Sequence, residues 1–223
     1  MFLGFLVRLL FERLYGSEAD RLSQSILKIH DGLGYEVCRP SFMVQCALVS
    51  AEDHRAYSHP GFDVVSIVRA CVKKILGIGT EGGSTIVQQL VRVLSSSYER
   101  TLRRKFKEIV LSCLVSARLE RSVFPPVYLS VAYFGTGVVG YAAVCKRLGL
   151  HGDILSIKEA AMVVARLKYP EPLKMSESKK AKIVNRELHI IRLYAKHKEM
   201  GYYDFLAAIR SVKPDVEKVG APS

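Results

Sequence analysis

Two adjacent carboxylates, Glu52 and Asp53, open the stretch EDHRAYSHPG and follow directly on an apolar segment. A glutamate held at the end of an apolar helix is a suitable general base. Taken alone, the pair is better explained as the ordinary acidic end of a helix. His59, seven positions after Glu52, is interpreted as a structural hydrogen-bonding residue. The stretch therefore supplies one candidate base, Glu52, whose role depends on its neighbours.

A small polar segment, GGST at residues 82–85, precedes a predicted helix. Backbone amides and hydroxyls at a helix N-terminus can hold an anion or sugar hydroxyls. The same residues serve equally well as a plain helix cap. Gln88 and Arg92 follow on one face of that helix, with Gln89 beside them.

A run of cations, RTLRRKFKE, occupies residues 100–108. Arg100, Arg104 and Glu108 recur every four residues, so a helix would place them on one face, with Lys107 adjacent. Alone, such a pattern is typical of an exposed salt-bridge ladder. In this order, however, the three segments indicate chemistry on a sugar with a phosphate leaving group. They combine a base, a polar loop and cations for the departing anion.

The elements that position these segments are predicted to be helical, because apolar residues recur at helical spacing and few runs alternate. The expected helices cover residues 41–51, 63–76, 85–94, 101–120, 156–167 and 178–198, with another over 202–212. Ser84 is expected to cap the helix at 85–94, and Ser156 and Glu159 form a capping box. Pro125 and Pro126 are expected to stop the helical run before them. The predicted fold class is therefore mainly α.

Composition fits one domain, residues 1–223, because 49% of the residues are hydrophobic. The 33 basic and 21 acidic residues give a net charge of +12, which favours an anionic partner. No nucleic-acid-binding signature occurs, so nucleic acid is not the expected partner. The five cysteines lack any CxxC or Cys/His spacing, and no protein-held metal site is predicted.

The N-terminal segment, residues 1–20, is amphipathic. Arg8, Glu12 and Arg13 interrupt its apolar residues, so it is too short and too charged for a spanning helix. Two interpretations stay open: it lies in a membrane interface, or it packs on the domain. It also lacks the features of a signal peptide, so no visible signal supports export.

In this combination, the chain resembles the family 51 glycosyltransferases over residues 42–193. These are the peptidoglycan glycosyltransferase domains of monofunctional transglycosylases and class A penicillin-binding proteins. The family motif EDxxFxxHxG matches Glu52, Asp53, His59 and Gly61. The motif GGSTxxQQ matches Gly82, Gly83, Ser84, Thr85, Gln88 and Gln89. The motif RKxxE matches Arg104, Lys105 and Glu108.

The resemblance implies a lysozyme-like, two-lobed helical domain with a central cleft and a small membrane-facing jaw. It implies polymerisation of lipid II by a peripheral protein at the outer, periplasmic face of the bacterial inner membrane. Glu52 and Glu108 would be catalytic: Glu52 deprotonates the acceptor 4-hydroxyl, and Glu108 lies on the donor side. The substrate-binding residues carried over are Asp53, His59, Gly83, Ser84, Thr85, Gln88, Gln89, Arg92, Arg100, Arg104, Lys105 and Lys107. We expect the two glutamates to face each other across one open cleft.

The partners implied by the resemblance are lipid II, the growing glycan chain, the membrane surface, and penicillin-binding or cell-division proteins. No tightly bound cofactor is implied, although a divalent cation, Mg²⁺ or Mn²⁺, could accompany the pyrophosphate. The jaw corresponds to the segment between the first two motifs, where apolar and basic residues mix in a way that suits an anionic lipid surface. These residues are Ile67, Val68, Arg69, Val72, Lys73, Lys74, Ile75, Leu76 and Ile78.

The chain departs from the family pattern at four places. Ala56 replaces Phe, Val87 replaces Thr, Arg92-Val93 replaces Lys-Asn, and Ser130 replaces Asn. These departures support one alternative, a degenerate module that binds lipid II or glycan without turnover. Another alternative is a lytic or hydrolytic enzyme acting on finished peptidoglycan, since lysozyme-like folds also host glycosidases. The polar loop and the cations argue against it, because glycan cleavage releases no pyrophosphate.

Overall fold

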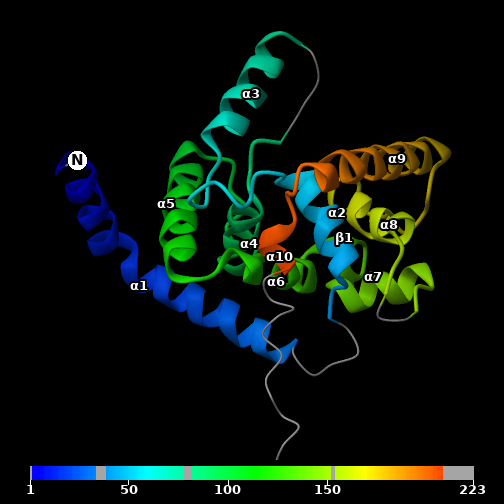
Figure 1. Ribbon diagram of the computed structural model, residues 1–223, viewed down its shortest axis with the longest axis horizontal. Coiled ribbons are helices and arrows are strands. Elements are labelled where there is room, and N and C mark those ends of the chain that lie inside the picture. Colours follow the sequence, from blue (N-terminus) through cyan, green and yellow to red (C-terminus); the bar gives the residue numbers. More distant parts are fainter. Residues whose placement is uncertain (1, 34–38, 78–81, 152–153, 208–223) are drawn as a thin grey trace, which may run out of the picture.

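The computed structural model describes residues 2–33, 39–77, 82–151 and 154–207 (Figure 1). The prediction of a mainly α fold is confirmed, and a two-stranded antiparallel hairpin is the sheet found in the described part. The helices are α1 (Phe2–Gly32), α2 (Phe42–Glu52), α3 (Val64–Ile75), α4 (Ile86–Leu94), α5 (Leu102–Arg118), the 3₁₀ turn η1 (Arg121–Val123), α6 (Phe124–Val131), α7 (Tyr141–Leu148), α8 (Ile157–Lys168), α9 (Glu177–Glu199) and α10 (Asp204–Ala207). The strands are β1 (Tyr133–Gly135) and β2 (Val138–Val139). Of the helix expected over 202–212, residues 208–212 lie outside the described residues.

Side-chain caps fix where several helices begin. Ser41 caps α2, and Ser156 caps α8 through the predicted capping box with Glu159. For α4 the predicted cap was wrong. Thr85, and not Ser84, accepts the hydrogen bond from the Gln88 amide, at 3.2 Å. The hydroxyl of Ser84 instead accepts a hydrogen bond from Lys105, which leaves the cap to the next residue.

The proline pair at residues 125–126 has a different role from the predicted one. The α5 helix ends earlier, at Arg118, and the two prolines lie in the first turn of α6. An amide in a first turn has no intrahelical partner, so proline costs little there. The hairpin follows α6, and Gly140 ends it at a φ of 82°. A Cβ at Gly140 would lie 2.5 Å from the Ser130 carbonyl oxygen, so only glycine fits.

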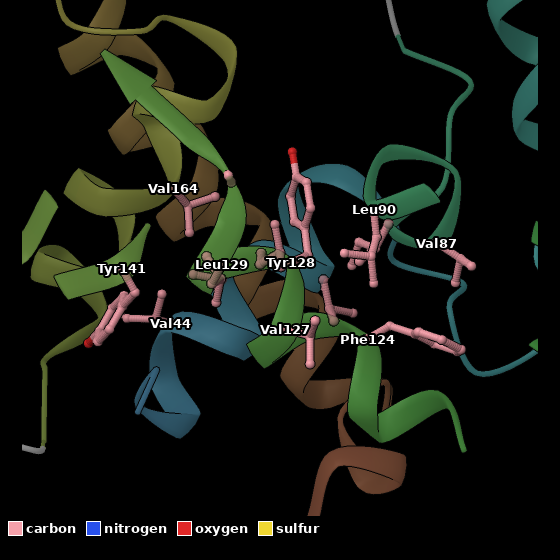
Figure 2. Close-up of a cluster of buried hydrophobic side chains, with 14 of the residues drawn as sticks. Val44, Val87, Leu90, Phe124, Val127, Tyr128, Leu129, Tyr141 and Val164 are labelled. Atoms are coloured by element: carbon pink, nitrogen blue, oxygen red, sulfur yellow. The ribbon is translucent and has the colours of Figure 1, made fainter. Parts of the chain in front are cut away.

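The core forms where α2 packs on α6, α8 and α9, and where α4 packs on α5 and α6. Figure 2 shows how side chains from these elements meet: Val44 of α2, Leu90 of α4, Val127 and Leu129 of α6, and Val164 of α8. In contrast, α3 projects from the body (Figure 1). Its apolar side chains Val64, Val65, Val68, Val72 and Ile75 are 47–83% exposed. Of the predicted jaw residues, Ile78 lies outside the described residues.

The first helix is longer than the predicted 1–20 segment. Its second half packs on α5 and α6 and buries Ala19, Leu22 and Ile26. Leu10 and Leu14, nearer its start, are 53% and 60% exposed. The second half of α1 therefore agrees with the interpretation that this segment packs on the domain. The exposed leucines of the first half are compatible with the other interpretation, a position in a membrane interface. No helix among the described residues has both the length and the apolar character needed to cross a bilayer.

Candidate active site

A cleft of about 440 Å³ opens at the C-terminal end of α2. Its walls come from α2, α3, the 82–85 loop, α8 and α9. Glu52, the last residue of α2, lies in this cleft and is 20% exposed. Its Oε1 accepts a hydrogen bond from Arg186 Nη2 at 2.9 Å, and its Oε2 accepts a long one from Gln89 Nε2 at 3.4 Å. Glu52 is therefore held between α9 and α4 at the edge of open space.

Both oxygens of the neighbouring carboxylate, Asp53, form hydrogen bonds within the protein. Its Oδ2 accepts a hydrogen bond from the Ile86 amide at 3.0 Å, and its Oδ1 lies 2.8 Å from His59 Nε2. Because His59 Nδ1 accepts a hydrogen bond from the Gly61 amide at 3.2 Å, neutral His59 carries its proton on Nε2 and donates to Asp53. The side chains of His59 and Asp53 are 6% and 3% exposed. Asp53 and His59 thus connect the segment after α2 to the start of α4. This hydrogen bond agrees with the interpretation of His59 as a structural residue.

The GGST segment lies tightly between α3 and α4. A Cβ at Gly83 would come within 3.2 Å of the Ile67 Cα, so glycine allows the loop to approach α3 closely. Thr85 Oγ1 donates to the Gly61 carbonyl at 2.7 Å. Gln88 is fully buried and completes the capping box of α4. Gly83, Ser84 and Thr85 line the cleft, and Gln88 lies behind them.

Glu108 is the second predicted carboxylate, and it is only 3% exposed. Three cations surround it. Arg92 forms two hydrogen bonds with its oxygens, at 2.9 and 3.0 Å, Lys105 Nζ lies 2.7 Å from Oε1, and Arg104 contacts Oε2. Burial alone would raise the pKa of Glu108, but the hydrogen bonds from Arg92 and Lys105 outweigh it and the pKa is lowered. Glu108 is therefore a buried anion at neutral pH.

One open cleft shared by the two glutamates was expected, but Glu52 and Glu108 line different hollows. Glu108 lines a separate hollow of about 50 Å³ with Arg92, Arg104 and Lys107. Lys105 joins the two regions, since its Nζ also lies 3.0 Å from Ser84 Oγ and from Gln88 Oε1. Burial lowers the pKa of Lys105.

Two of the predicted cations make no ion pair with Glu108 among the described residues. Arg100 precedes α5, which begins at Leu102, so it does not share a helical face with Arg104 and Glu108 as predicted. The helix starts later because Thr101 is its cap. Lys107 Nζ forms an ion pair with Glu18 of α1, at 2.8 Å. Its partner is thus the first helix, not the Glu108 carboxylate.

The cleft also contains basic residues that were not predicted to bind substrate: Arg69 and Lys73 of α3, Lys168 of α8, and Arg186 and Lys196 of α9. The two from α3 had been assigned to the jaw. For Arg186, a signal was present in the sequence. It lies three residues after Ile183 and four before Ile190, both buried, so helical spacing puts all three on the inner face of α9.

Two histidine side chains that line the cleft, His54 and His197, pack against each other and against Tyr202. The rings of His54 and His197 are stacked with centroids 5.1 Å apart, and Tyr202 packs against both. Burial, followed by the charges of His54 and Lys196, lowers the pKa of His197 to about 4. Burial, followed by the charge of Arg69, also lowers the pKa of His54. Both rings are neutral at pH 7, which lets them stack.

Comparison with known proteins shows similarity to a transglycosylase family and to penicillin-binding proteins. The sequence profile of the Transglycosylase family matches residues 36–194. A biosynthetic peptidoglycan transglycosylase of Thiobacillus denitrificans is 33% identical over 150 residues, covering 66% of this chain and 64% of that protein. Penicillin-binding protein 1A of Rickettsia prowazekii is 31% identical over 160 residues, covering 70% of this chain and 20% of that protein. Penicillin-binding protein 1A of Aquifex aeolicus is 38% identical over 126 residues, covering 56% and 17%. The chain thus spans about a fifth of the length of these penicillin-binding relatives.

Proposed function

Because the chain belongs to the transglycosylase family, we propose that it is a peptidoglycan glycosyltransferase that polymerises lipid II into glycan strands. Glu52 acts as the general base on the 4-hydroxyl of the acceptor sugar. The freed oxygen attacks the anomeric carbon of the lipid-linked donor chain, and the bond to the pyrophosphate breaks. The proton passes to Glu52, and the leaving group carries away the negative charge.

One observation carries this proposal: Glu52 is the exposed carboxylate of the cleft, with its side chain 20% exposed against 3% for Asp53 and for Asp63. Three carboxylates line the cleft, namely Glu52, Asp53 and Asp63. Asp53 bonds to His59 and the start of α4, and Asp63 accepts hydrogen bonds from two amides and a hydroxyl at the start of α3. Glu52 Oε2 receives a single hydrogen bond from the described residues, at 3.4 Å. A carboxylate oxygen can accept more than one, so Oε2 has acceptor capacity left.

The cations of the cleft support a pyrophosphate leaving group. Developing negative charge is stabilised most when cations are already positioned in a site of restricted water access. Arg69, Lys73, Lys168 and Lys196 face the cleft, and Lys105 reaches its edge through Ser84. Glu108 holds Arg92, Arg104 and Lys105 in fixed positions. Glu108 thereby acts on the donor side by ordering cations.

We propose a peripheral position at the outer face of the bacterial inner membrane, where lipid II would be met. The support is the exposed apolar face of α3, which lies next to the cleft cations Arg69 and Lys73. No group of three or more His, Cys, Asp or Glu among the described residues could hold a metal ion. We propose that a divalent cation, Mg²⁺ or Mn²⁺, would enter together with the pyrophosphate.

The test is polymerisation of purified lipid II in detergent, followed by separation of the glycan products by size. We expect the wild-type chain to make glycan strands and Glu52→Gln to lose at least about 99% of that rate, because removing a general base costs roughly 100-fold or more. The control is Glu199→Gln, an exposed glutamate at the end of α9, which should retain activity. Binding of lipid II without polymer would identify the non-catalytic alternative, and soluble fragments from purified sacculi would identify the lytic one.

A further inference from the structure

Arg186 offsets the unfavourable charge at the position of Glu52. Glu52 is the last residue of α2, and the C-terminal end of a helix carries partial negative charge that disfavours a carboxylate. Arg186 Nη2 donates to Glu52 Oε1 and to the Ala51 carbonyl, both at 2.9 Å. A single guanidinium nitrogen thus satisfies the helix end and the carboxylate together.

Arg186 is itself held firmly. It lies on α9 between the buried residues Ile183 and Ile190, and α9 packs on both α2 and α8. Its side chain is 11% exposed, so the guanidinium has little freedom to turn away into solvent. Its Nε is buried and has no hydrogen-bond partner among the described residues. The orientation of Arg186 toward Glu52 is therefore set by the packing of α9.

The other oxygen of Glu52 is held more loosely. Gln89 Nε2 approaches Oε2 at 3.4 Å, near the upper limit for a hydrogen bond. The orientation of that amide is fixed from behind, because Tyr128 donates its hydroxyl proton to Gln89 Oε1 at 2.7 Å. Figure 2 shows the Tyr128 hydroxyl directed out of the apolar cluster that buries its ring. Oε1 is thus fixed by a strong contact, while Oε2 is guided by a weak one.

We infer that Arg186 is the positioning residue for Glu52: it fixes Oε1 and so presents Oε2 to the acceptor hydroxyl. The inference rests on the proposed function and adds a role for a residue outside the three sequence motifs. In the proposed reaction, the hydroxyl proton moves to Oε2 while Arg186 stays on Oε1. Proton transfer requires close and aligned atoms, so losing this contact should slow turnover more than it weakens binding.

Kinetics of Arg186→Met, Arg186→Lys and Arg192→Met test the inference. Arg192 is an exposed arginine of the same helix and serves as the matched control. We expect Arg186→Met to lower kcat by about 100-fold, the order of loss for a 1 Å misplacement, with KM changed by less than about threefold. Arg186→Lys should recover part of kcat, and Arg192→Met should match the wild type. A large rise in KM with kcat retained would overturn the inference, because it would make Arg186 a substrate ligand.

Thermal unfolding provides a measurement that does not need activity. Tm is measured for the wild type, Arg186→Met, Glu52→Gln and the double variant. We expect the fall in Tm caused by Arg186→Met to be at least about 2 °C smaller in the Glu52→Gln background, because the pair is coupled. Equal falls in both backgrounds would overturn the inference. A coupled pair in a wild-type chain that makes no polymer would instead overturn the proposed function, and leave the contact established.

Discussion

At the scale of single residues, Glu108 differs from Glu52 in what surrounds it. Glu108 is buried among Arg92, Arg104 and Lys105, whereas Glu52 has one arginine and open space. A buried carboxylate with several charge-assisted hydrogen bonds stays ionised and is poorly suited to take up a proton. The two glutamates that the motifs treat alike therefore have different chemistry. Glu108 organises cations, and Glu52 remains the candidate base.

Replacing Glu108 by glutamine should destabilise the fold. The amide cannot neutralise three cations, and removing one partner of a buried ion pair costs about 3–5 kcal/mol. Urea denaturation monitored by circular dichroism would measure the free energy of unfolding. Glu120→Gln is the matched control, because Glu120 is exposed and makes no side-chain cap contact, and should change it by less than about 0.5 kcal/mol. Equal effects of the two substitutions would contradict this account.

At the scale of elements, α1 and α3 attach to the domain in different ways. Arg118 of α5 pairs with Glu12 and Asp20 of α1, each at 2.7 Å, and Lys107 pairs with Glu18. These contacts and the buried residues of its second half fasten α1 to α5. In contrast, the loop at Gly83 packs closely against α3. Most of the apolar side chains of α3 are exposed. An exposed apolar helix face beside basic residues is suited to a lipid surface.

The exposed face of α3 should contribute to membrane binding. Ile75 is 83% exposed on α3, and Ile154, which precedes α8, is 90% exposed. Burying an isoleucine side chain contributes roughly 1.5–3 kcal/mol, so Ile75→Glu should weaken binding to vesicles containing anionic lipid by at least about tenfold. Ile154→Glu is the control for the same chemical change away from α3. Co-sedimentation with vesicles measures both, and unchanged binding of Ile75→Glu would exclude α3 as the contact.

At the scale of the whole molecule, aromatic packing links the C-terminal end of α9 to the residues that follow the candidate base. The ring of His54, two residues after Glu52, stacks on the ring of His197 near the end of α9. The short helix α10 follows α9 in the chain. The unfolded chain binds protons at these histidines near pH 6.5, whereas burial keeps the folded His197 neutral down to about pH 4. Acid therefore favours the unfolded state in this range.

Stability should fall as the pH drops from about 6.5 to about 4, and His197→Phe should reduce that fall. In this window the unfolded state binds more protons at His197 than the folded state, so the contribution is complete above pH 6.5 and is lost below it. One proton limits the slope to about 1.4 kcal/mol per pH unit. Chemical denaturation at several pH values would measure this slope. His151→Phe, at an exposed position, is the control and should leave the slope unchanged.

The sequence by itself determined the features that depend on neighbours within one helical turn. The mainly α fold, the capping box of Ser156 and Glu159, and the approach of Arg104 to Glu108 follow from spacings of three or four residues. The motifs also point to Glu52 as the candidate base, and that assignment stays a prediction. The predictions of the fold, the capping box and the Arg104–Glu108 contact succeed because hydrogen bonds and side-chain contacts along a helix are set by local geometry.

Only the tertiary structure decided which distant groups meet. Arg186 reaches Glu52 across 134 positions of sequence, and Lys107 pairs with Glu18 instead of contributing to the Glu108 cluster. The contact between Arg92 and Glu108 has the same origin, because the two side chains come from different helices, α4 and α5. Such contacts depend on how α1, α4 and α9 pack against the core. Packing of this kind follows from the summed burial of many side chains and leaves no mark on the spacing of the charged residues themselves.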